Sequence, residues 1–309
     1  MPYAVRRESH SEFLTLRGLR YHVRQWGDET LVTPDRPPLV LLHGWMDVGA
    51  SFQFLVDELQ ALEGPGRWII APDWRGFGLT QTPGQDAYWF PDYLGDLDAL
   101  LDALLARAPS DQQIDLVGHS MGGNVVMLYA GIRPGRIRRL VNLEGFGQPA
   151  SRPEDAPARY ATWLDELKEP AELRGYPGVD GVARRLQKNN PLLTTERADW
   201  LAAHWSAPDA DGQWQILGDP VHKRSNAVLY RKEEALACWA AIEAPVMWVE
   251  GDRTDTARWW GTRYTKAEFH ERLNVVRRTE RHVLSPAGHM LHHDQPEALA
   301  GLLKSFLGG

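Results

Sequence analysis

Short, mostly apolar runs that alternate with segments of helical spacing constrain the fold of this chain most. Four of these runs occur in its first half: PPLVLLHG, RWIIAPD, IDLVGHS and RIRRLVNLEG. Apolar runs without polar alternation are typical of strands buried on both faces of a sheet. Between them, apolar residues recur at helical spacing over 50–62, 92–107 and 122–132. Strands that alternate with helices in this way predict an α/β fold, with a mostly parallel sheet covered on both faces.

This alternation is preceded by a hairpin and interrupted by one long insertion. Residues 12–26 alternate apolar and polar side chains around a central Arg-Gly, which predicts two antiparallel strands. Over 146–243 the alternation lapses into scattered helical spacing with many prolines, and APVMWVEGD then restores a buried strand. We expect a core made of residues 1–145 and 244–309, with the intervening segment folded as a mainly helical cap.

The predicted cap is rich in tryptophan. Five of the thirteen tryptophans fall within it, among them Trp205 and Trp214. Indole offers large, rigid apolar surface of the kind that lines ligand cavities, although some of these side chains must fill a core. We expect Trp205 and Trp214 to line a substrate pocket.

Charge and composition exclude several classes of protein. The net charge of −7 and the pI near 5.9 argue against a nucleic-acid binder, which would show a basic face. The single cysteine, Cys238, allows no intrachain disulfide, and no run of about 18 uncharged apolar residues is present to span a bilayer. Residues 1–10 carry charges and lack the apolar stretch of a signal peptide. We therefore expect a soluble, cytoplasmic protein without nucleic-acid or membrane partners.

The candidate chemistry centres on Gly118-His119-Ser120-Met121-Gly122, a G-x-S-x-G pattern. It follows the predicted strand IDLV and precedes the apolar helix NVVMLYA, the context in which this pattern forms a nucleophile elbow. A sharp strand-to-helix turn exposes the serine hydroxyl, and the flanking glycines let strand and helix approach closely. A purely structural glycine-rich turn is the alternative, and this context favours it less. Ser120 is therefore the candidate nucleophile.

A second turn, His43-Gly44-Trp45, closes the predicted strand LVLL. A turn at this place can offer a backbone N–H to an oxyanion, opposite the N–H of the residue that follows the nucleophile. We expect the N–H groups of Trp45 and Met121 to form the oxyanion hole. His43 is expected to brace the loop and to border the substrate pocket.

The candidate general base is His289, in the segment AGHM beyond the last predicted strand. Imidazole can be neutral near pH 7 and can accept the proton of a serine hydroxyl. His292, His293 and Asp294 follow, and this cluster could ligate zinc. No helical His-Glu-x-x-His pair accompanies them, and a serine nucleophile needs no metal. We therefore predict no metal and no cofactor, and expect His292 and His293 to be loop or pocket residues.

A carboxylate is needed to orient the base and to stabilise its imidazolium form. The chain order of serine, acid and histidine leaves two places for it. One is the loop after PVMWVEG, which contains Asp252 and Asp255, and the other is Glu144, which ends RRLVNLEG. Asp252 could instead form a turn, and Glu144 could be a buried carboxylate bonded to nearby N–H groups. The residues alone leave these alternatives open.

The segments LLHGW, APDWRGFGLT, LVGHSMGGNVV and AGHMLHHDQPEAL together resemble the α/β-hydrolase superfamily. Within it they are similar to the bacterial esterase/lipase-like branch, which carries a helical cap between the sixth and seventh core strands. The resemblance covers residues 12–145 and 244–308, whereas the cap resembles no family. It implies an α/β-hydrolase fold in which Ser120 is the nucleophile, His289 the base and the two predicted backbone N–H groups the oxyanion donors.

The chain departs from the family pattern at the acid. Many members carry it three residues after the glycine of the seventh strand, where this chain has Thr254. Asp255 stands one residue later and Asp252 two residues earlier. Glu144 stands where dehalogenase-like relatives place their acid, but those relatives use an aspartate nucleophile in place of Ser120, which argues against dehalogenase or epoxide hydrolase chemistry. We favour Asp255, because a loop longer by one residue can still aim it at the base, with Glu144 second and Asp252 third.

These inferences predict a carboxylesterase that acts on small to medium apolar esters through an acyl-enzyme. Hydrolysis of C–C bonds, lactones or amides by the same residues is an alternative, because fold and triad do not separate these reactions. A catalytically silent ligand-binding protein is the alternative from another class, since a cap that never opens would give the same sequence features.

Overall fold

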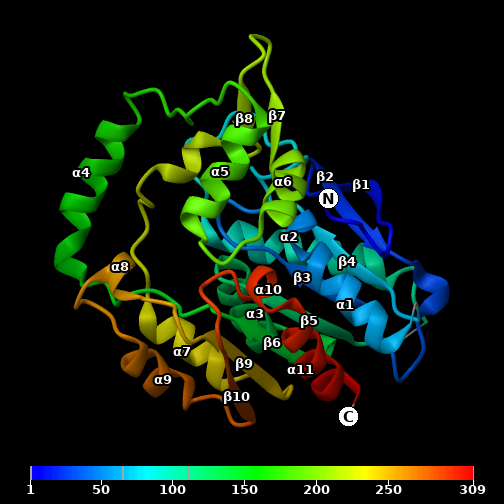
Figure 1. Ribbon diagram of the computed structural model, residues 1–309. Coiled ribbons are helices and arrows are strands. Elements are labelled where there is room, and N and C mark those ends of the chain that lie inside the picture. The colour runs from blue at the N-terminus through cyan, green and yellow to red at the C-terminus, as the bar shows by residue number, and fades with distance from the viewer. Residues whose placement is uncertain (1, 65, 110–111, 309) are drawn as a thin grey trace.

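The computed structural model describes residues 2–64, 66–109 and 112–308, and over these residues the chain builds one eight-stranded sheet (Figure 1). The strand order is β1-β2-β4-β3-β5-β6-β9-β10, and β1 and β2 form the predicted hairpin. The β1–β2 and β2–β4 pairs are antiparallel, and the other pairs of this sheet are parallel. The strands are β1 (His10–Leu16), β2 (Leu19–Trp26), β3 (Leu39–Leu42), β4 (Ile69–Pro72), β5 (Ile114–His119), β6 (Ile137–Leu143), β9 (Val246–Gly251) and β10 (Thr279–Leu284).

Helices cover both faces of this sheet. Alternate residues of each strand contact different helices, because successive side chains point to opposite faces. In β3, Leu39 and Leu41 belong to one apolar cluster, and Val40 and Leu42 belong to the other. The first cluster includes α1 (Gln53–Glu63) and α11 (Pro296–Gly308), and the second includes α2 (Phe90–Leu105), α3 (Met121–Ile132), α7 (Lys232–Ala240) and α9 (Lys266–Leu273). The predicted α/β class is confirmed. In the described part of the chain, no helix is both long and apolar enough to cross a membrane.

The segment between β6 and β9 adds no strand to the main sheet. It contains α4 (Ala156–Glu166), α5 (Val179–Asn189), α6 (Thr195–Trp205) and a two-stranded ribbon of β7 (Ser206–Pro208) and β8 (Trp214–Ile216). Helices α5 and α6 and the ribbon enclose a small apolar core of their own, to which Phe54 of α1 contributes. Figure 1 shows these elements stacked on one end of the core, with α4 standing apart.

Helix α7 falls within the range predicted as cap but packs on the core. It lies against α3, and a Cβ on Gly131 of α3 would overlap the carbonyl oxygen of Cys238. Trp239 of α7 is buried in the apolar cluster that also contains residues of α2, α3 and α9. We propose that the predicted cap corresponds to residues 146–231, called the cap segment below.

The cap segment is attached to the core at the loop that follows β4. The His222 ring is sandwiched between the rings of Phe77 and Tyr88, with centroid distances of 3.8 and 3.6 Å. Backbone pairing strengthens this attachment, because the Gly78 N–H donates to the Leu217 carbonyl at 2.9 Å. This side of the cap segment is therefore held to the core by stacking and by backbone hydrogen bonds.

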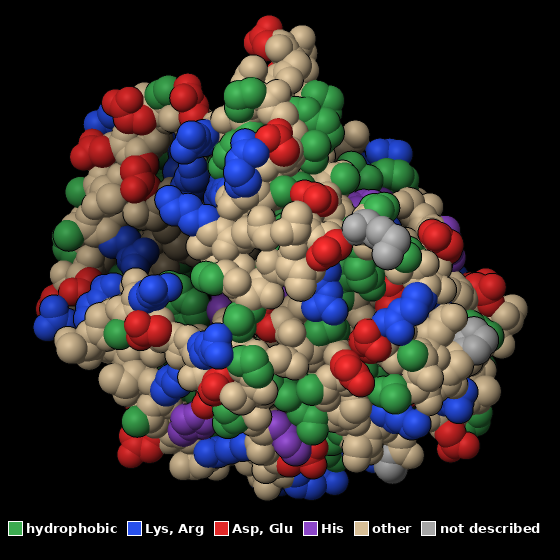
Figure 2. Space-filling model, viewed as in Figure 1, with side chains coloured by type: hydrophobic (Ala, Val, Ile, Leu, Met, Phe, Trp, Pro, Cys, Tyr) green, Lys and Arg blue, Asp and Glu red, His purple; other side chains and the backbone are tan. Residues whose placement is uncertain are grey.

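Helix α4 is attached far more loosely. None of its residues is buried, and Tyr160 and Leu164 are about half exposed. Its last turn borders a cavity of about 580 Å³ that Lys223 and Arg224 also line. Figure 2 shows a hollow between α4 and the rest of the cap segment, with lysine and arginine side chains along its edge.

Candidate active site

The predicted elbow forms at the junction of β5 and α3. Strand β5 ends at His119 and α3 begins at Met121, so Ser120 alone makes the turn. Its φ of 53° lies in the left-handed region, which a residue with a side chain rarely occupies. The Ser120 N–H donates to the Leu143 carbonyl of β6 at 2.8 Å, which holds this backbone in place. The turn therefore presents the serine side chain at the end of the sheet.

Close approach of backbone explains the two glycines of the pattern. A Cβ on Gly118 would overlap the carbonyl of Gly122, and a Cβ on Gly122 would overlap the carbonyl oxygen of Leu42 at the end of β3. Any larger residue would push α3 away from β3 and β5. The G-x-S-x-G spacing thus follows from how closely strand and helix pack.

Ser120, His289 and Glu144 form a continuous chain of hydrogen bonds. The Ser120 Oγ lies 2.9 Å from Nε2 of His289, and Nδ1 of His289 lies 2.9 Å from Oε2 of Glu144. A carboxylate only accepts, so Nδ1 carries the proton and Nε2 presents its lone pair to the serine hydroxyl. This is the tautomer that a general base needs.

Glu144 reaches His289 because it follows β6 directly, and β6 is the neighbour of β5 in the sheet. Its backbone also adopts a left-handed conformation, with φ of 59°, and its N–H donates to the Val249 carbonyl at 3.1 Å. The side chain is 1% exposed, and its Oε1 accepts the Gly251 N–H at 2.6 Å. One carboxylate oxygen is thus anchored to β9, which aims the other at His289.

The preference for Asp255 as the acid is therefore wrong. Asp255 is exposed and accepts the Ala257 N–H at 3.0 Å, in the turn that precedes the short helix α8 (Ala257–Trp260). Asp252 is also exposed and accepts from Ser285 and from the backbone of Ala287, as the turn-forming alternative anticipated. The position that carries the acid in many relatives, Thr254, is buried beside the Glu144 carboxyl group.

Burial shifts both ionisable partners towards their uncharged forms. It raises the pKa of Glu144, against the Gly251 amide, which stabilises the carboxylate. It also lowers the pKa of His289, because a buried imidazolium is poorly solvated. The hydrogen bonds from the Gly251 N–H and from Nδ1–H of His289 oppose this penalty and favour the carboxylate form of Glu144.

The loop after β3 lies against the elbow, as an oxyanion hole requires. A Cβ on Gly44 would come within 3.1 Å of the Ser120 Cβ, so the Gly44 backbone is beside the nucleophile. Met121 is the first residue of α3, and its N–H has no partner within the helix. The donor roles of Trp45 and Met121 fit this arrangement and remain a prediction.

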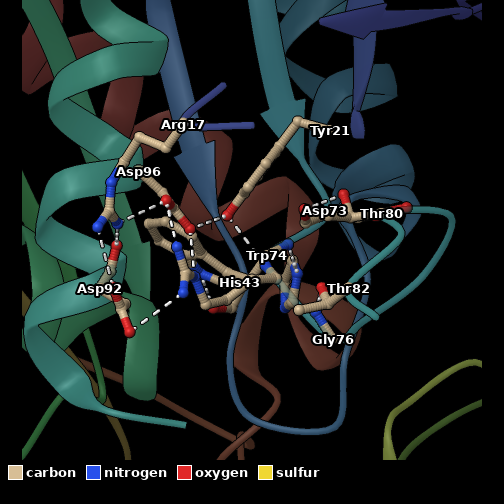
Figure 3. A network of polar contacts seen from close by, with 11 residues as sticks. Arg17, Tyr21, His43, Asp73, Trp74, Gly76, Thr80, Thr82, Asp92 and Asp96 are labelled. Atoms are coloured by element: carbon tan, nitrogen blue, oxygen red, sulfur yellow. Dashed lines mark hydrogen bonds and ion pairs between the residues drawn. The ribbon is translucent and has the colours of Figure 1, made fainter. Parts of the chain in front are cut away.

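His43 does not border a pocket, which corrects that part of the prediction. It is fully buried, its Nδ1–H donates to the Gly44 carbonyl at 2.7 Å, and its Nε2 accepts the Trp74 N–H at 2.9 Å. Burial lowers the pKa of the His43 ring to about 4, so it stays neutral. Its bonds join the loop after β3 to the loop after β4, and Figure 3 shows it beside Trp74.

The loop after β4 is itself held in place by the buried carboxylate of Asp96. Asp96 of α2 accepts from Arg75 at 2.5 and 2.6 Å, and also from Arg17 and Tyr21 at 3.0 Å. Figure 3 shows the Asp96 carboxylate between Arg17 and Tyr21. These bonds fix the loop against which His43 and the cap segment pack.

The two tryptophans predicted to line a pocket pack within the cap segment. Trp205 and Trp214 lie against its small apolar core, and the β8 backbone at Trp214 pairs with Tyr176. The Trp205 indole also faces the Asp47 carboxyl group. Trp205 therefore reaches the loop after β3, and the role of both tryptophans in lining a substrate pocket stays a prediction.

Two residues that contact His289 were not predicted from the sequence. The Trp259 ring of α8 stands edge-to-face with the His289 ring at a centroid distance of 4.6 Å, and Trp259 is 42% exposed. The Nε2–H of His119 donates to the His289 carbonyl at 2.7 Å and so holds the loop of the base. His119 is part of the recognisable elbow, but no sequence signal singles out Trp259.

His292 and His293, expected to be loop or pocket residues, lie in the short helix α10 (Leu291–Asp294) and are buried. His292 and His293 both lie against the Ser51 hydroxyl, at 3.2 and 2.6 Å. Asp294 instead accepts from the Gly288 N–H and from Asn190. These three consecutive residues therefore do not converge on one point, as a zinc site built from them would require.

The chain is similar to known proteins along most of its length. Residues 39–302 match the model of a family described as the alpha/beta hydrolase family. The serine hydrolase-like protein of Danio rerio is 25% identical over 287 residues, which cover 87% of this chain and 81% of that protein. The 2-hydroxy-6-oxo-2,4-heptadienoate hydrolase of Pseudomonas putida is 35% identical over 113 residues, or 36% of this chain and 38% of that enzyme. The thioesterase domain from the curacin biosynthetic pathway matches with a TM-score of 0.80 and 25% identity, over 96% of this chain and 99% of that domain.

Proposed function

Because the chain belongs to the alpha/beta hydrolase family, we propose that it is a serine hydrolase that cleaves neutral, apolar carboxylic esters through an acyl-enzyme. The observation that carries the proposal is the chain of two 2.9 Å hydrogen bonds from Ser120 through His289 to Glu144. A serine hydroxyl is a weak nucleophile by itself and needs a base within hydrogen-bond reach, oriented by a third group. This arrangement supplies both.

In the proposed reaction each residue has one task. The Ser120 oxygen attacks the ester carbonyl while Nε2 of His289 takes its proton. Glu144 keeps Nδ1 protonated and stabilises the imidazolium that forms. The N–H groups of Met121 and Trp45 bind the oxyanion. His289 then donates its proton to the leaving alcohol, and the same base activates a water molecule for deacylation. No step needs a cofactor.

Exposed aromatic side chains next to the candidate site support an apolar substrate. Trp45 follows the glycine that touches Ser120 and is 51% exposed, and Trp259 stands over His289. Exposed indoles offer apolar contact area to an acyl or alcohol group. A domain of similar fold is named a thioesterase, an activity that cleaves a related carbonyl bond.

Covalent labelling and a substrate series test the proposal together. We expect a fluorophosphonate probe to label the wild-type protein and not Ser120→Ala. We also expect p-nitrophenyl esters of two to eight acyl carbons to be hydrolysed by the wild type only. A protein that is labelled at another residue, or a Ser120→Ala variant that still hydrolyses the esters, would contradict the assignment. A folded protein that neither reacts with the probe nor turns over any ester would instead be the silent binding protein.

A second candidate activity is hydrolysis of a C–C bond next to a carbonyl group. It is supported by the 35% identity to the heptadienoate hydrolase over the part of this chain that it covers. Adding a 2-hydroxy-6-oxo-dienoate to the substrate series distinguishes the two reactions. A kcat/KM on that compound at least 100-fold above the best ester would favour the second candidate.

A further inference from the structure

A second polar cluster lies buried behind the proposed base. Asp47 of the loop after β3, His119 at the end of β5 and His292 of α10 (Leu291–Asp294) are at most 2% exposed. One ligand atom from each lies within 4.8 Å of the others. The His119 ring also contacts both His289 and His292, at centroid distances of 4.9 and 4.5 Å. None of these three side chains has a task in the proposed reaction.

Each member of the cluster has a buried polar atom without a hydrogen bond. Among the described residues, Oδ2 of Asp47 and Nδ1 of both His119 and His292 find no partner. Buried polar atoms are nearly always bonded, because leaving one unpaired costs about 1–3 kcal/mol. Three such atoms in one cluster make it a candidate ligand site, bordered by the Ser51 hydroxyl at 3.2 Å from Nε2 of His292 and by the Trp205 indole, which faces Asp47.

The chemistry of the free atoms favours a cation. The Nε2–H of His119 donates to the His289 carbonyl, so its Nδ1 carries an unshared lone pair. The Asp47 carboxylate accepts the Val48 N–H through Oδ1, and its Oδ2 lies 3.9 Å from Nε2 of His292. A buried carboxylate without a positively charged partner is costly.

We propose that Asp47, His119 and His292 bind a divalent transition-metal ion of the Zn²⁺ type, which ties together the three loops that carry the proposed catalytic groups. Two imidazoles and one carboxylate suit Zn²⁺, Co²⁺ or Ni²⁺ rather than Mg²⁺ or Ca²⁺, which prefer oxygen ligands throughout. Zinc sites with three protein ligands leave the fourth position to water. Tetrahedral ligands around Zn²⁺ are about 3.4 Å apart, so the side chains must draw together by about 1 Å on binding.

The position of the cluster explains why occupancy would affect the whole site. Asp47 follows Trp45 by two residues, His119 precedes Ser120, and His292 follows His289 by three. An ion held by all three joins the oxyanion loop, the elbow and the loop of the base. Because the ion binds the folded chain and not this arrangement in the unfolded chain, it must stabilise the fold.

Metal binding to the full-length protein can be measured without any substrate. After treatment with a chelator, we expect one equivalent of Zn²⁺ to bind, and we expect Tm to rise by about 5 °C at a free Zn²⁺ concentration 100-fold above Kd. Co²⁺ should give visible absorption bands of a four-coordinate site. Both effects should be lost in Asp47→Asn and in His292→Gln, two separate variants in case one folds poorly.

The control is His282→Gln, because His282 forms an exposed pair with Glu280 at 3.2 Å that could bind metal adventitiously. Wild-type binding that persists in His282→Gln and disappears in the two cluster variants supports the proposal. Absence of Zn²⁺ binding, as expected for a cluster that holds water only, overturns it. Binding that survives Asp47→Asn and His292→Gln but is lost in Glu144→Gln or His282→Gln also overturns it, because the ion then lies elsewhere. None of these results depends on whether the protein hydrolyses esters.

Discussion

Replacing Glu144 by glutamine should nearly abolish activity while leaving the fold intact. In the wild type, Oε1 of Glu144 accepts the Gly251 N–H at 2.6 Å and Oε2 faces Nδ1 of His289 at 2.9 Å. In Glu144→Gln only the amide oxygen can accept from Gly251, so the NH2 group must face His289. An NH2 group donates, and Nδ1 of His289 must then accept.

The size of the effect follows from the tautomer. If Nδ1 accepts, the ring proton moves to Nε2, which then points at the Ser120 hydroxyl and cannot take its proton. Loss of the correct tautomer in a serine triad costs about 10⁴-fold in kcat, or about 5 kcal/mol of transition-state stabilisation. The neutral amide is cheaper to bury than a carboxylate, so we expect the melting temperature to stay the same or to rise.

Steady-state kinetics and thermal unfolding of two variants test this reasoning. Asp255→Asn is the matched control, because Asp255 is an exposed carboxylate that accepts the Ala257 N–H in the turn before α8. Its kcat/KM should stay within about threefold of the wild type, with at most about 1 kcal/mol lost from the free energy of unfolding. A Glu144→Gln enzyme that keeps a tenth of its activity, or an Asp255→Asn enzyme that loses it, would refute the assignment of the acid.

Three further predictions concern the nucleophile, the stacked histidine and the elbow. Ser120→Ala should lower kcat by at least 10³-fold with a melting temperature within about 2 °C of the wild type, and residual esterase activity in a clean preparation would contradict this. Burial lowers the pKa of His222 to about 4. Below pH 6.5 the His222 ring therefore takes up a proton when the protein unfolds. The stabilisation that the neutral, buried ring provides is complete above pH 6.5 and is lost as the pH falls towards 4. In His222→Phe, the slope of unfolding free energy against pH over that range, measured by urea denaturation, should therefore fall by about 1 kcal/mol per pH unit, whereas an unchanged slope would show that His222 does not titrate on unfolding. Gly122→Ala should cost about 3 kcal/mol of unfolding free energy, because its Cβ would overlap the Leu42 carbonyl, whereas Gly135→Ala, with nothing within 4 Å, should change it by less than about 0.5 kcal/mol; equal effects would refute the packing argument.

The fold was predictable from the sequence because buried elements show patterns of apolar residues that can be recognised within a few neighbouring positions. Strands β3, β4 and β5 are buried along their whole length, and the G-x-S-x-G pattern shows where a strand packs closely against a helix. The oxyanion loop could be placed for the same reason, since it follows the buried strand β3 directly, whereas His289 was placed by its position beyond the last predicted strand. These features depend on a few neighbouring residues, and such residues are read reliably from the chain itself.

The acid could not be identified in this way because the choice depends on contacts between strands. The number of residues after Gly251 suggested Asp255. In the structure, Glu144 directly follows β6, the strand next to β5, and the Gly251 amide of β9 fixes its orientation. Its left-handed backbone is not expected of a glutamate either. Helix α7 was assigned to the cap for a similar reason: its contact with α3 rests on close approach at Gly131, which one isolated glycine does not reveal.

The position of Glu144 directly after β6 also determines which part of the loop after β9 can change in sequence. Up to Thr254, the loop after β9 supports Glu144 and must keep its conformation. Beyond Thr254 it contributes no charge to the Ser120–His289–Glu144 chain, yet it carries Trp259 over the imidazole. Substitutions at its exposed residues 257–259 would therefore alter the surface that a substrate meets and leave the hydrogen bonds of Ser120, His289 and Glu144 unchanged, whereas Thr256 is buried and Trp260 packs against the core.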